Sequence, residues 1–118
     1  MRLNCQVRQA SSNLDAKHYD TERIRKEYLV ENVMVPDEIN MVYSMFDRII
    51  AGGAVPVKED LLLSAPEILR ADYFTQRREL GIINVGGAGT VVVGDEEYHL
   101  EYKEALYIGR GNRHVTFK

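Results

Sequence analysis

Short runs of β-branched and aromatic residues, separated by turn-forming residues, recur along this sequence and limit the folds that it can adopt. The runs are NVMV (32–35), MVYSMF (41–46), RIIA (48–51), GIINV (81–85), TVVV (90–93), YHLEY (98–102), ALYIG (105–109) and HVTFK (114–118). Runs of four to six such residues are typical of strands. Many short strands with turns between them predict a mainly β fold, a sandwich or a barrel, and not an α/β sheet.

Two of these runs form an expected hairpin. Gly94 and Asp95 stand between TVVV and YHLEY, and Gly-Asp is a favourable pair for a tight hairpin turn. Within YHLEY the residues Tyr98, Leu100 and Tyr102 share one face, and the polar residues between them share the other. The alternation predicts a half-buried strand.

One helix is expected near the N-terminus, over 20–29. Asp20 or Thr21 can cap it, and the residues ERIRKEYL that follow contain oppositely charged pairs at i,i+4. Ile24 and Tyr28 lie on the opposite face of this helix, so we expect them to dock on a sheet.

Composition excludes several classes of protein. The 118 residues carry 15 basic and 18 acidic side chains, a net charge of −3, so there is no basic excess to hold nucleic acid. Cys5 is the only cysteine, which excludes an intrachain disulfide and suits a reducing cytosol. The N-terminus lacks the apolar run of a secretion signal, and no stretch approaches the roughly 18 apolar residues of a membrane span. We therefore expect a cytoplasmic protein with no membrane partner.

The glycines Gly86, Gly87 and Gly89 invite comparison with a phosphate-binding loop. Such a loop is followed by a helix N-terminus, whose amides hold the phosphate. Here the strand-like TVVV follows, and the lysine and hydroxyl residue of a P-loop are missing. We expect a tight β-turn with bulge glycines instead.

The charged triplet Arg77-Arg78-Glu79 precedes an apolar run and allows two interpretations. Two arginines can grip the carboxylate of a sugar acid, which makes Arg77 and Arg78 candidates for substrate binding. They can equally pair with carboxylates at a subunit interface, and we favour that structural interpretation. No pair of carboxylates and no serine or cysteine stands out as catalytic.

Three histidines are present, and none is part of an evident metal site. His18 and His99 are expected to be solvated, whereas His114 ends the pattern Gly109-x-Gly111-x-x-His114. Zinc needs three or four converging ligands, so a single histidine does not make a metal site.

Four segments together resemble the 5-keto-4-deoxyuronate isomerase family. They are EYLVENVMVPDEINMVYSMFDR (27–48), DRIIAGGAVP (47–56), YFTQRRELGIINVGGAGTV (73–91) and EALYIGRG (104–111). The resemblance extends from about His18 to the end of the chain. It implies a cupin-like antiparallel β-sandwich or barrel, and it makes residues 1–118 the N-terminal domain of a two-part protein at least roughly twice this length. The run HVTFK, which stops in mid-pattern, also suggests a fragment of something longer.

The same resemblance implies an activity. These isomerases interconvert 5-keto-4-deoxyuronate and 3-deoxy-2,5-hexodiulosonate in pectin and polyuronate breakdown, so a small-molecule uronate is the expected substrate and a homo-oligomer the expected assembly. The family carries zinc on a segment H-x-H-x4-E followed by a third histidine, in the C-terminal half. No such segment exists in this sequence. The resemblance therefore implies no metal ligand and no catalytic residue within these 118 residues.

The run YFTQRREL has the outline of a metal-binding cupin strand. Tyr73 and Thr75 stand where two histidine ligands would be, the glutamate position falls on Glu79 or Leu80, and His114 closes the pattern. Two of the four positions could bind a metal, so we expect a strand without its metal chemistry. Three hypotheses stay open: the N-terminal part of a zinc isomerase, a sugar-acid-binding module that uses Arg77 and Arg78, and a small cupin enzyme built on His114.

Overall fold

The chain begins with a strand and two helices and continues almost entirely as strands. A computed structural model describes residues 2–112 and 114–118. Its elements are β1 (Arg2–Arg8), α1 (Asn13–Ala16), α2 (Thr21–Tyr28), β2 (Glu38–Ser44), β3 (Ile49–Ala54), β4 (Leu61–Leu62), the 3-10 turn η1 (Glu67–Leu69), β5 (Leu80–Ile83), β6 (Gly89–Val93), β7 (Glu96–Leu100), β8 (Ala105–Ile108) and β9 (Val115–Phe117). The prediction of a mainly β fold with antiparallel sheets is confirmed, and the arrangement is compatible with a cupin-like sandwich.

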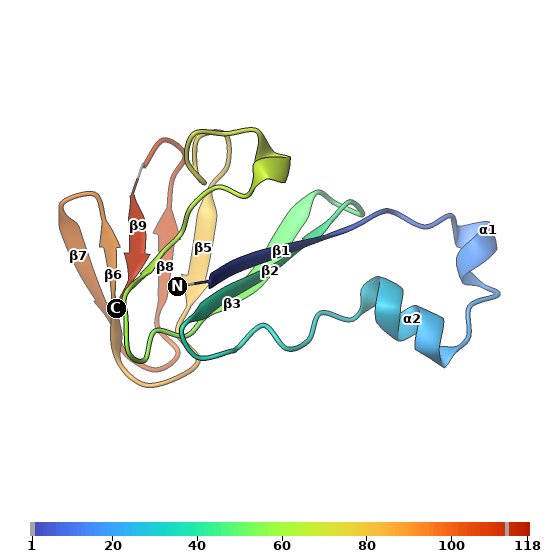
Figure 1. Ribbon diagram of the computed structural model, residues 1–118, viewed down its shortest axis with the longest axis horizontal. Coiled ribbons are helices and arrows are strands. Elements are labelled where there is room, and N and C mark those ends of the chain that lie inside the picture. The colour runs from blue at the N-terminus through green and yellow to red at the C-terminus, as the bar shows by residue number, and fades with distance from the viewer. Residues whose placement is uncertain (1, 113) are drawn as a thin grey trace.

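The strands form three sheets, in the orders β1-β2-β3, β4-β9-β6-β7 and β5-β8. Every pairing is antiparallel except that of β1 with β2, which is parallel. Figure 1 shows the C-terminal strands gathered at one end of the molecule and the two helices at the other, with the sheet β1-β2-β3 between them. Strand β1 was not anticipated from the sequence, although RLNCQVR alternates apolar and polar residues.

The core lies between the inner face of the first sheet and the C-terminal strands. Because strand side chains alternate between faces, every second residue of β2 points inward, and these residues are buried. The buried cluster comprises Ile39, Met41, Tyr43, Leu61, Leu63, Leu69, Phe74, Val91, Leu100, Ile108 and Val115. The C-terminal sheets therefore pack against the first sheet through this apolar cluster.

Two predictions about strands need correction. The run 32–35 is not a strand: Val33 and Met34 instead lie against Gly53 of β3, so close that a Cβ on this glycine would be 2.7 Å from the Met34 Sδ. In YHLEY, only Leu100 is buried, and Tyr102 lies in the turn after β7 and is exposed. The hairpin between β6 and β7 is confirmed, with Gly94 at a φ of 60° in its turn.

Helix α2 lies where the sequence predicts it. The Asp20 carboxylate caps its first turn by accepting from the Arg23 amide at 2.8 Å. The expected docking on a sheet is wrong for Ile24, which is 45% exposed. Tyr28 instead packs against the Phe46 ring in the turn after β2, with 5.2 Å between the ring centroids and 45° between the ring planes. Helix α1 was not predicted from the sequence.

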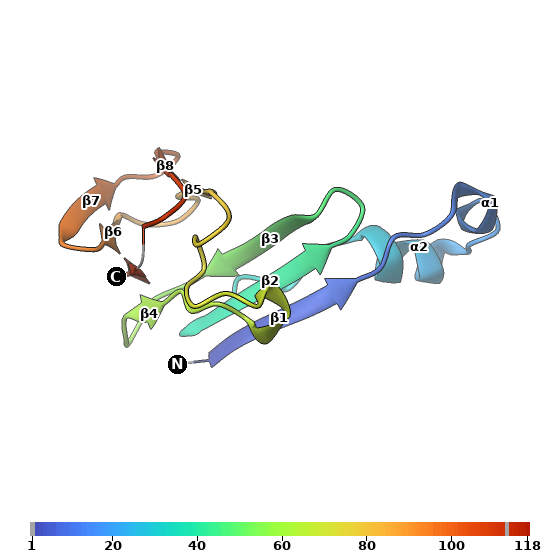
Figure 2. The same cartoon turned by 90° about the horizontal axis from the view of Figure 1, so that it is seen from above.

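Residues 9–28, which we call the helical arm, extend away from the body (Figure 2), and the chain then returns to the first sheet, where Met34 lies against Gly53. Neither of its helices has a buried residue. The described chain measures 49 × 29 × 24 Å with a radius of gyration of 15.5 Å, whereas a compact domain of this length has a radius of gyration of about 13.5 Å. No helix among the described residues is long and apolar enough to cross a membrane.

Candidate functional site

The segment 70–79, which contains the tyrosine, threonine and arginines singled out by the sequence, is a series of turns and not a strand. Thr75 is fully buried, its hydroxyl donates to the carbonyl of Asn112, and its own carbonyl accepts from the Gly111 amide at 2.7 Å. These bonds tie the segment to the loop after β8. The prediction that YFTQRREL is a cupin strand that lacks metal chemistry is therefore wrong in its strand, because only Leu80 of this run belongs to a strand, β5.

Arg77 contacts backbone carbonyls at the end of η1. One of its terminal nitrogens donates to Leu69 O at 2.6 Å and to Arg70 O at 2.7 Å. Arg70 has a left-handed conformation with a φ of 48°, which ends the 3-10 turn and leaves these carbonyls without helical partners. Arg77 thus acts as a side-chain cap on η1.

Arg78 points to a different element. Its guanidinium lies over the Tyr43 ring of β2, 5.2 Å from the centroid, and donates to the Tyr43 hydroxyl at 3.4 Å. Its charge also reaches Cys5, where burial raises the thiol pKa and the nearby guanidinium partly opposes that rise. Because Arg77 and Arg78 are attached to separate elements, the structure does not show them as one clamp, and their role in binding a substrate stays a prediction.

Glu79 pairs with a tyrosine and not with either arginine. Its carboxylate accepts from the Tyr107 hydroxyl of β8 at 2.5 Å, and this bond raises the pKa of Tyr107. Among the ion pairs of the described residues, none includes Glu79. Glu79 is therefore attached to β8 through Tyr107 and is not an ion-pair partner of the two arginines that precede it.

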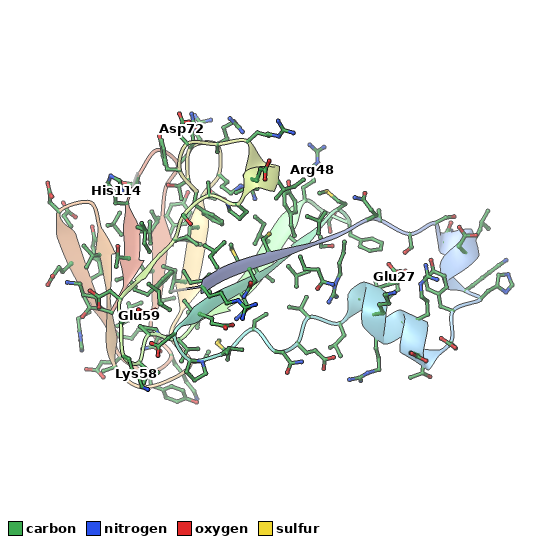
Figure 3. The ribbon with its side chains drawn as sticks, in the orientation of Figure 1. Glu27, Arg48, Lys58, Glu59, Asp72 and His114 are labelled. Carbon is green, nitrogen blue, oxygen red and sulfur yellow. The ribbon has the colours of Figure 1, made fainter. Side chains whose placement is uncertain are left out.

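The three histidines lie apart along the chain. His18 follows α1, His99 on β7 contacts the Glu101 carboxylate at 3.0 Å, and the carbonyl of His114 accepts from the Gly94 amide at 2.8 Å. Figure 3 shows His114 and Asp72 at one end of the C-terminal strands, with Lys58 and Glu59 at the other. Within residues 2–112 and 114–118, no three histidine, cysteine or acidic side chains lie close enough to hold a metal.

The glycine loop between β5 and β6 is organised by Asn84. Its side-chain oxygen accepts from the Gly86 amide at 3.0 Å, and its nitrogen donates to the carbonyls of Gly87 and Leu100, each at 2.9 Å. Such a bond from an asparagine to the amide two residues on is an Asx turn. A strand follows and not a helix, as predicted, but the loop is a bend held by the Asn84 side chain and not the expected tight β-turn with bulge glycines.

A groove of about 520 Å³ lies beside this loop, between β3 and β5. Its lining is mostly glycine and apolar side chains, from β3, from β5, from the loop 84–88 and from the end of the chain. Among the described lining residues, the polar side chains are those of Asn84, Thr90 and Lys118, and none is a carboxylate or an imidazole. The groove can hold an apolar group or a polypeptide, but its described lining supplies no general base.

The sequence was compared with known proteins, and no family model matches it. It is 55% identical over all 118 residues to "4-deoxy-L-threo-5-hexosulose-uronate ketol-isomerase" of Bacteroides fragilis, and 54% identical over the same length to "4-deoxy-L-threo-5-hexosulose-uronate ketol-isomerase 1" of Bacteroides thetaiotaomicron. The chain is a homologue of these ketol-isomerases. A third, from Lachnoclostridium phytofermentans, is 50% identical over 112 residues, or 95% of this chain.

The match covers all or nearly all of this chain but less than half of each ketol-isomerase. The chain spans 42% of the two Bacteroides proteins and 41% of the Lachnoclostridium protein. This extent fits an N-terminal portion, as the sequence resemblance predicts, and the match also includes the first residues, which the resemblance did not cover.

Three residues of this ketol-isomerase homologue make contacts that the sequence analysis did not predict: Thr75, Asn84 and Tyr107. The spacing Asn-x-Gly-Gly over 84–87 is a usable signal for the Asx turn. Nothing in the sequence indicates that Thr75 is buried against the loop after β8, or that Tyr107 reaches Glu79, because both contacts depend on how separate elements pack.

Proposed function

We propose that residues 1–118 form the N-terminal, cupin-like domain of a longer ketol-isomerase. The reaction is the interconversion of 5-dehydro-4-deoxy-D-glucuronate and 3-deoxy-D-glycero-2,5-hexodiulosonate, during breakdown of pectin and related polyuronates. The observation that carries the proposal is the 55% identity over the full length of this chain to a protein of that name. A cytoplasmic homo-oligomer acting on a small-molecule uronate accords with this activity.

In this proposal the domain supports the active site and does not contain it. Ketol isomerisation moves a proton between neighbouring carbons, and it needs a base and a group that stabilises the enediolate. The described groove lining has no carboxylate or imidazole. The Thr75 hydroxyl and the Glu79 carboxylate are each committed to another partner, so these candidate positions do not fit a zinc site. Zinc and the catalytic groups would belong to the part of the protein beyond these residues.

The test compares the 118-residue chain with the chain extended by its downstream reading frame. Each is mixed with 5-keto-4-deoxyuronate, and product is followed by NMR with and without a chelator. We expect turnover from the extended protein and none above the no-protein control from the 118 residues. Turnover by the 118-residue chain that survives the chelator and is lost in Glu79→Gln would contradict the proposal and place the active site in YFTQRREL.

A second candidate function is a module that binds a sugar acid without turnover. Arg78 favours it, because its one described hydrogen bond is long, at 3.4 Å, and a half-buried guanidinium can still bind a carboxylate. Titration with D-glucuronate tests this function. Binding that weakens at least tenfold in Arg78→Met but not in the exposed control Arg110→Met would support it, and no binding by the unmodified chain would exclude it.

A further inference from the structure

The groove between β3 and β5 is an apolar surface that the described residues leave open. Val85 and Ile83, two of its lining residues, are 59% and 68% exposed. Large exposed apolar side chains gathered around a concave surface are typical of a place where another segment or another molecule sits.

Two strands beside the groove also have an edge with which no described strand pairs. Among the described strands, β3 is hydrogen-bonded to β2 alone and β5 to β8 alone. Each therefore presents one unpaired strand edge, a row of amides and carbonyls that can accept a further strand. A glycine such as Gly81, where an added Cβ would have no atom within 4 Å, lets another backbone approach closely.

The end of the chain is positioned beside this groove. The Lys118 amide donates to Thr90 O at 2.8 Å, and its carbonyl accepts from the Thr90 amide at 3.0 Å, which continues the β6–β9 ladder to the last residue. The register pairs Val91 with Phe117, so a residue after Lys118 would lie opposite Gly89. Gly89 and its neighbour Ala88 both line the groove.

We propose that the polypeptide following Lys118 in the longer protein enters this groove as an extended segment and covers it. The inference rests on the proposed function, because it requires a continuation of the chain. The 118 residues are 42% of the Bacteroides fragilis protein, which is therefore about 280 residues long and has ample chain to supply such a segment. The ladder at Lys118 directs that segment past Gly89 and along the loop 84–88.

The lining favours a polypeptide over a uronate. A sugar acid carries a carboxylate and hydroxyl groups that need polar partners when they leave water. Among the described lining residues only Lys118 bears a charge, and its ammonium is 3.7 Å from the Glu97 carboxylate. An extended segment instead satisfies its own polar groups at the open edges and places apolar side chains in the groove.

The test uses the full-length protein and measures how fast engineered thiols react. Val85→Cys and Ala88→Cys place a thiol in the groove, and Asp95→Cys places a control thiol in the β6–β7 turn, which does not line it. Modification by iodoacetamide is read peptide by peptide by mass spectrometry. We expect both groove thiols to react at least tenfold more slowly than the control in the full-length protein, at every protein concentration and without substrate.

The other outcomes contradict the inference. Equal rates at all three positions, or a reading frame that stops after Lys118, would overturn it. Protection that appears only at high protein concentration would assign the groove to a second copy, and protection that appears only with uronate would assign it to a ligand. Turnover is measured on the same sample, so a protected groove without isomerase activity would reject the proposed activity but keep the continuation of the chain on which this inference depends.

Discussion

A single carboxylate oxygen, Oδ1 of Asp37, links the start of β2 to the loop before β4. It accepts from the amides of Val57, Lys58 and Glu59 at 2.9, 2.8 and 3.3 Å. These backbone bonds, with that from Lys58 contributing most, lower the pKa of the Asp37 carboxyl below its ordinary 3.8. Asp37 also has a φ of 59°, a conformation that aspartate and asparagine tolerate better than most residues.

The variant Asp37→Asn should be less stable than the unmodified chain at pH 7, and equally stable in acid. Asparagine keeps the oxygen and tolerates the backbone angle, so the difference isolates the negative charge. Because the folded pKa lies below the unfolded one, the stabilisation is complete above the unfolded pKa and is lost as the pH falls through the folded value. Urea midpoints at several pH values measure it, with Asp60→Asn in the same loop as control. If the difference in urea midpoint between Asp37→Asn and the unmodified chain does not change with pH, the negative charge does not contribute to stability.

Two strand glycines differ in the space beside them, which yields a matched pair of substitutions. A Cβ on Gly52 of β3 would lie 2.6 Å from Asn40 O and 2.7 Å from Met41 Cγ, whereas one on Gly81 of β5 meets nothing within 4 Å. We expect Gly52→Ala to lower the free energy of unfolding by about 1–3 kcal/mol, since neighbours must move. Gly81→Ala should be neutral or stabilising by up to about 1 kcal/mol. Urea titration of both variants checks this, and the reverse order of stabilities would be inconsistent with the packing around β3.

At the scale of elements, the sequence predicts what local chemistry determines and misses what packing determines. The β6–β7 hairpin follows from Gly94-Asp95, and the start of α2 follows from Asp20, because turns and caps are built from neighbouring residues. Strand β1 was missed although its alternation was visible, since its partner β2 lies far along the chain. The cap formed by Arg77 on η1 could not be foreseen, because it depends on the left-handed conformation of Arg70.

Helix α2 should unfold locally when its cap is removed. Asp20→Ala deletes the bond to the Arg23 amide and should destabilise the helix by about 1 kcal/mol, so that hydrogen exchange over 21–28 rises about fivefold. The helix has no buried residue, so the global unfolding midpoint should hardly change. Hydrogen–deuterium exchange by mass spectrometry measures the first effect and urea titration the second. A large fall in the midpoint would mean that the helical arm is coupled to the core more strongly than its contacts indicate.

At the scale of the whole molecule, the 118-residue chain leaves many large apolar side chains exposed outside its core. In the β5–β8 pair, Ile83, which also lines the groove, lies opposite Ala105, and Tyr107 lies opposite Gly81; both large side chains are about two-thirds exposed. Together with the open groove, these side chains make the isolated chain prone to association.

We expect the isolated 118-residue chain to form oligomers that grow with concentration. Sedimentation velocity across a hundredfold range of concentration measures this. Ile83→Lys should shift the onset of association to at least tenfold higher concentration, because it places a charge on this exposed apolar surface. Ile68→Lys on η1, which is 46% exposed and outside the groove, serves as the control. A chain that sediments as a monomer throughout would identify a self-sufficient domain.

The parallel pairing of β1 with β2 has a consequence for the order in which the chain folds. Partners in this pair are 36 residues apart, as for the Asn4 and Asn40 side chains at 2.8 Å, whereas β2 and β3 meet through a short turn. Closing a long loop costs more conformational entropy than closing a short one, so the β2–β3 hairpin can form early and β1 must wait. On the ribosome, β1 would thus be synthesised before β2 and β3 but would pair only after those two strands had formed their hairpin.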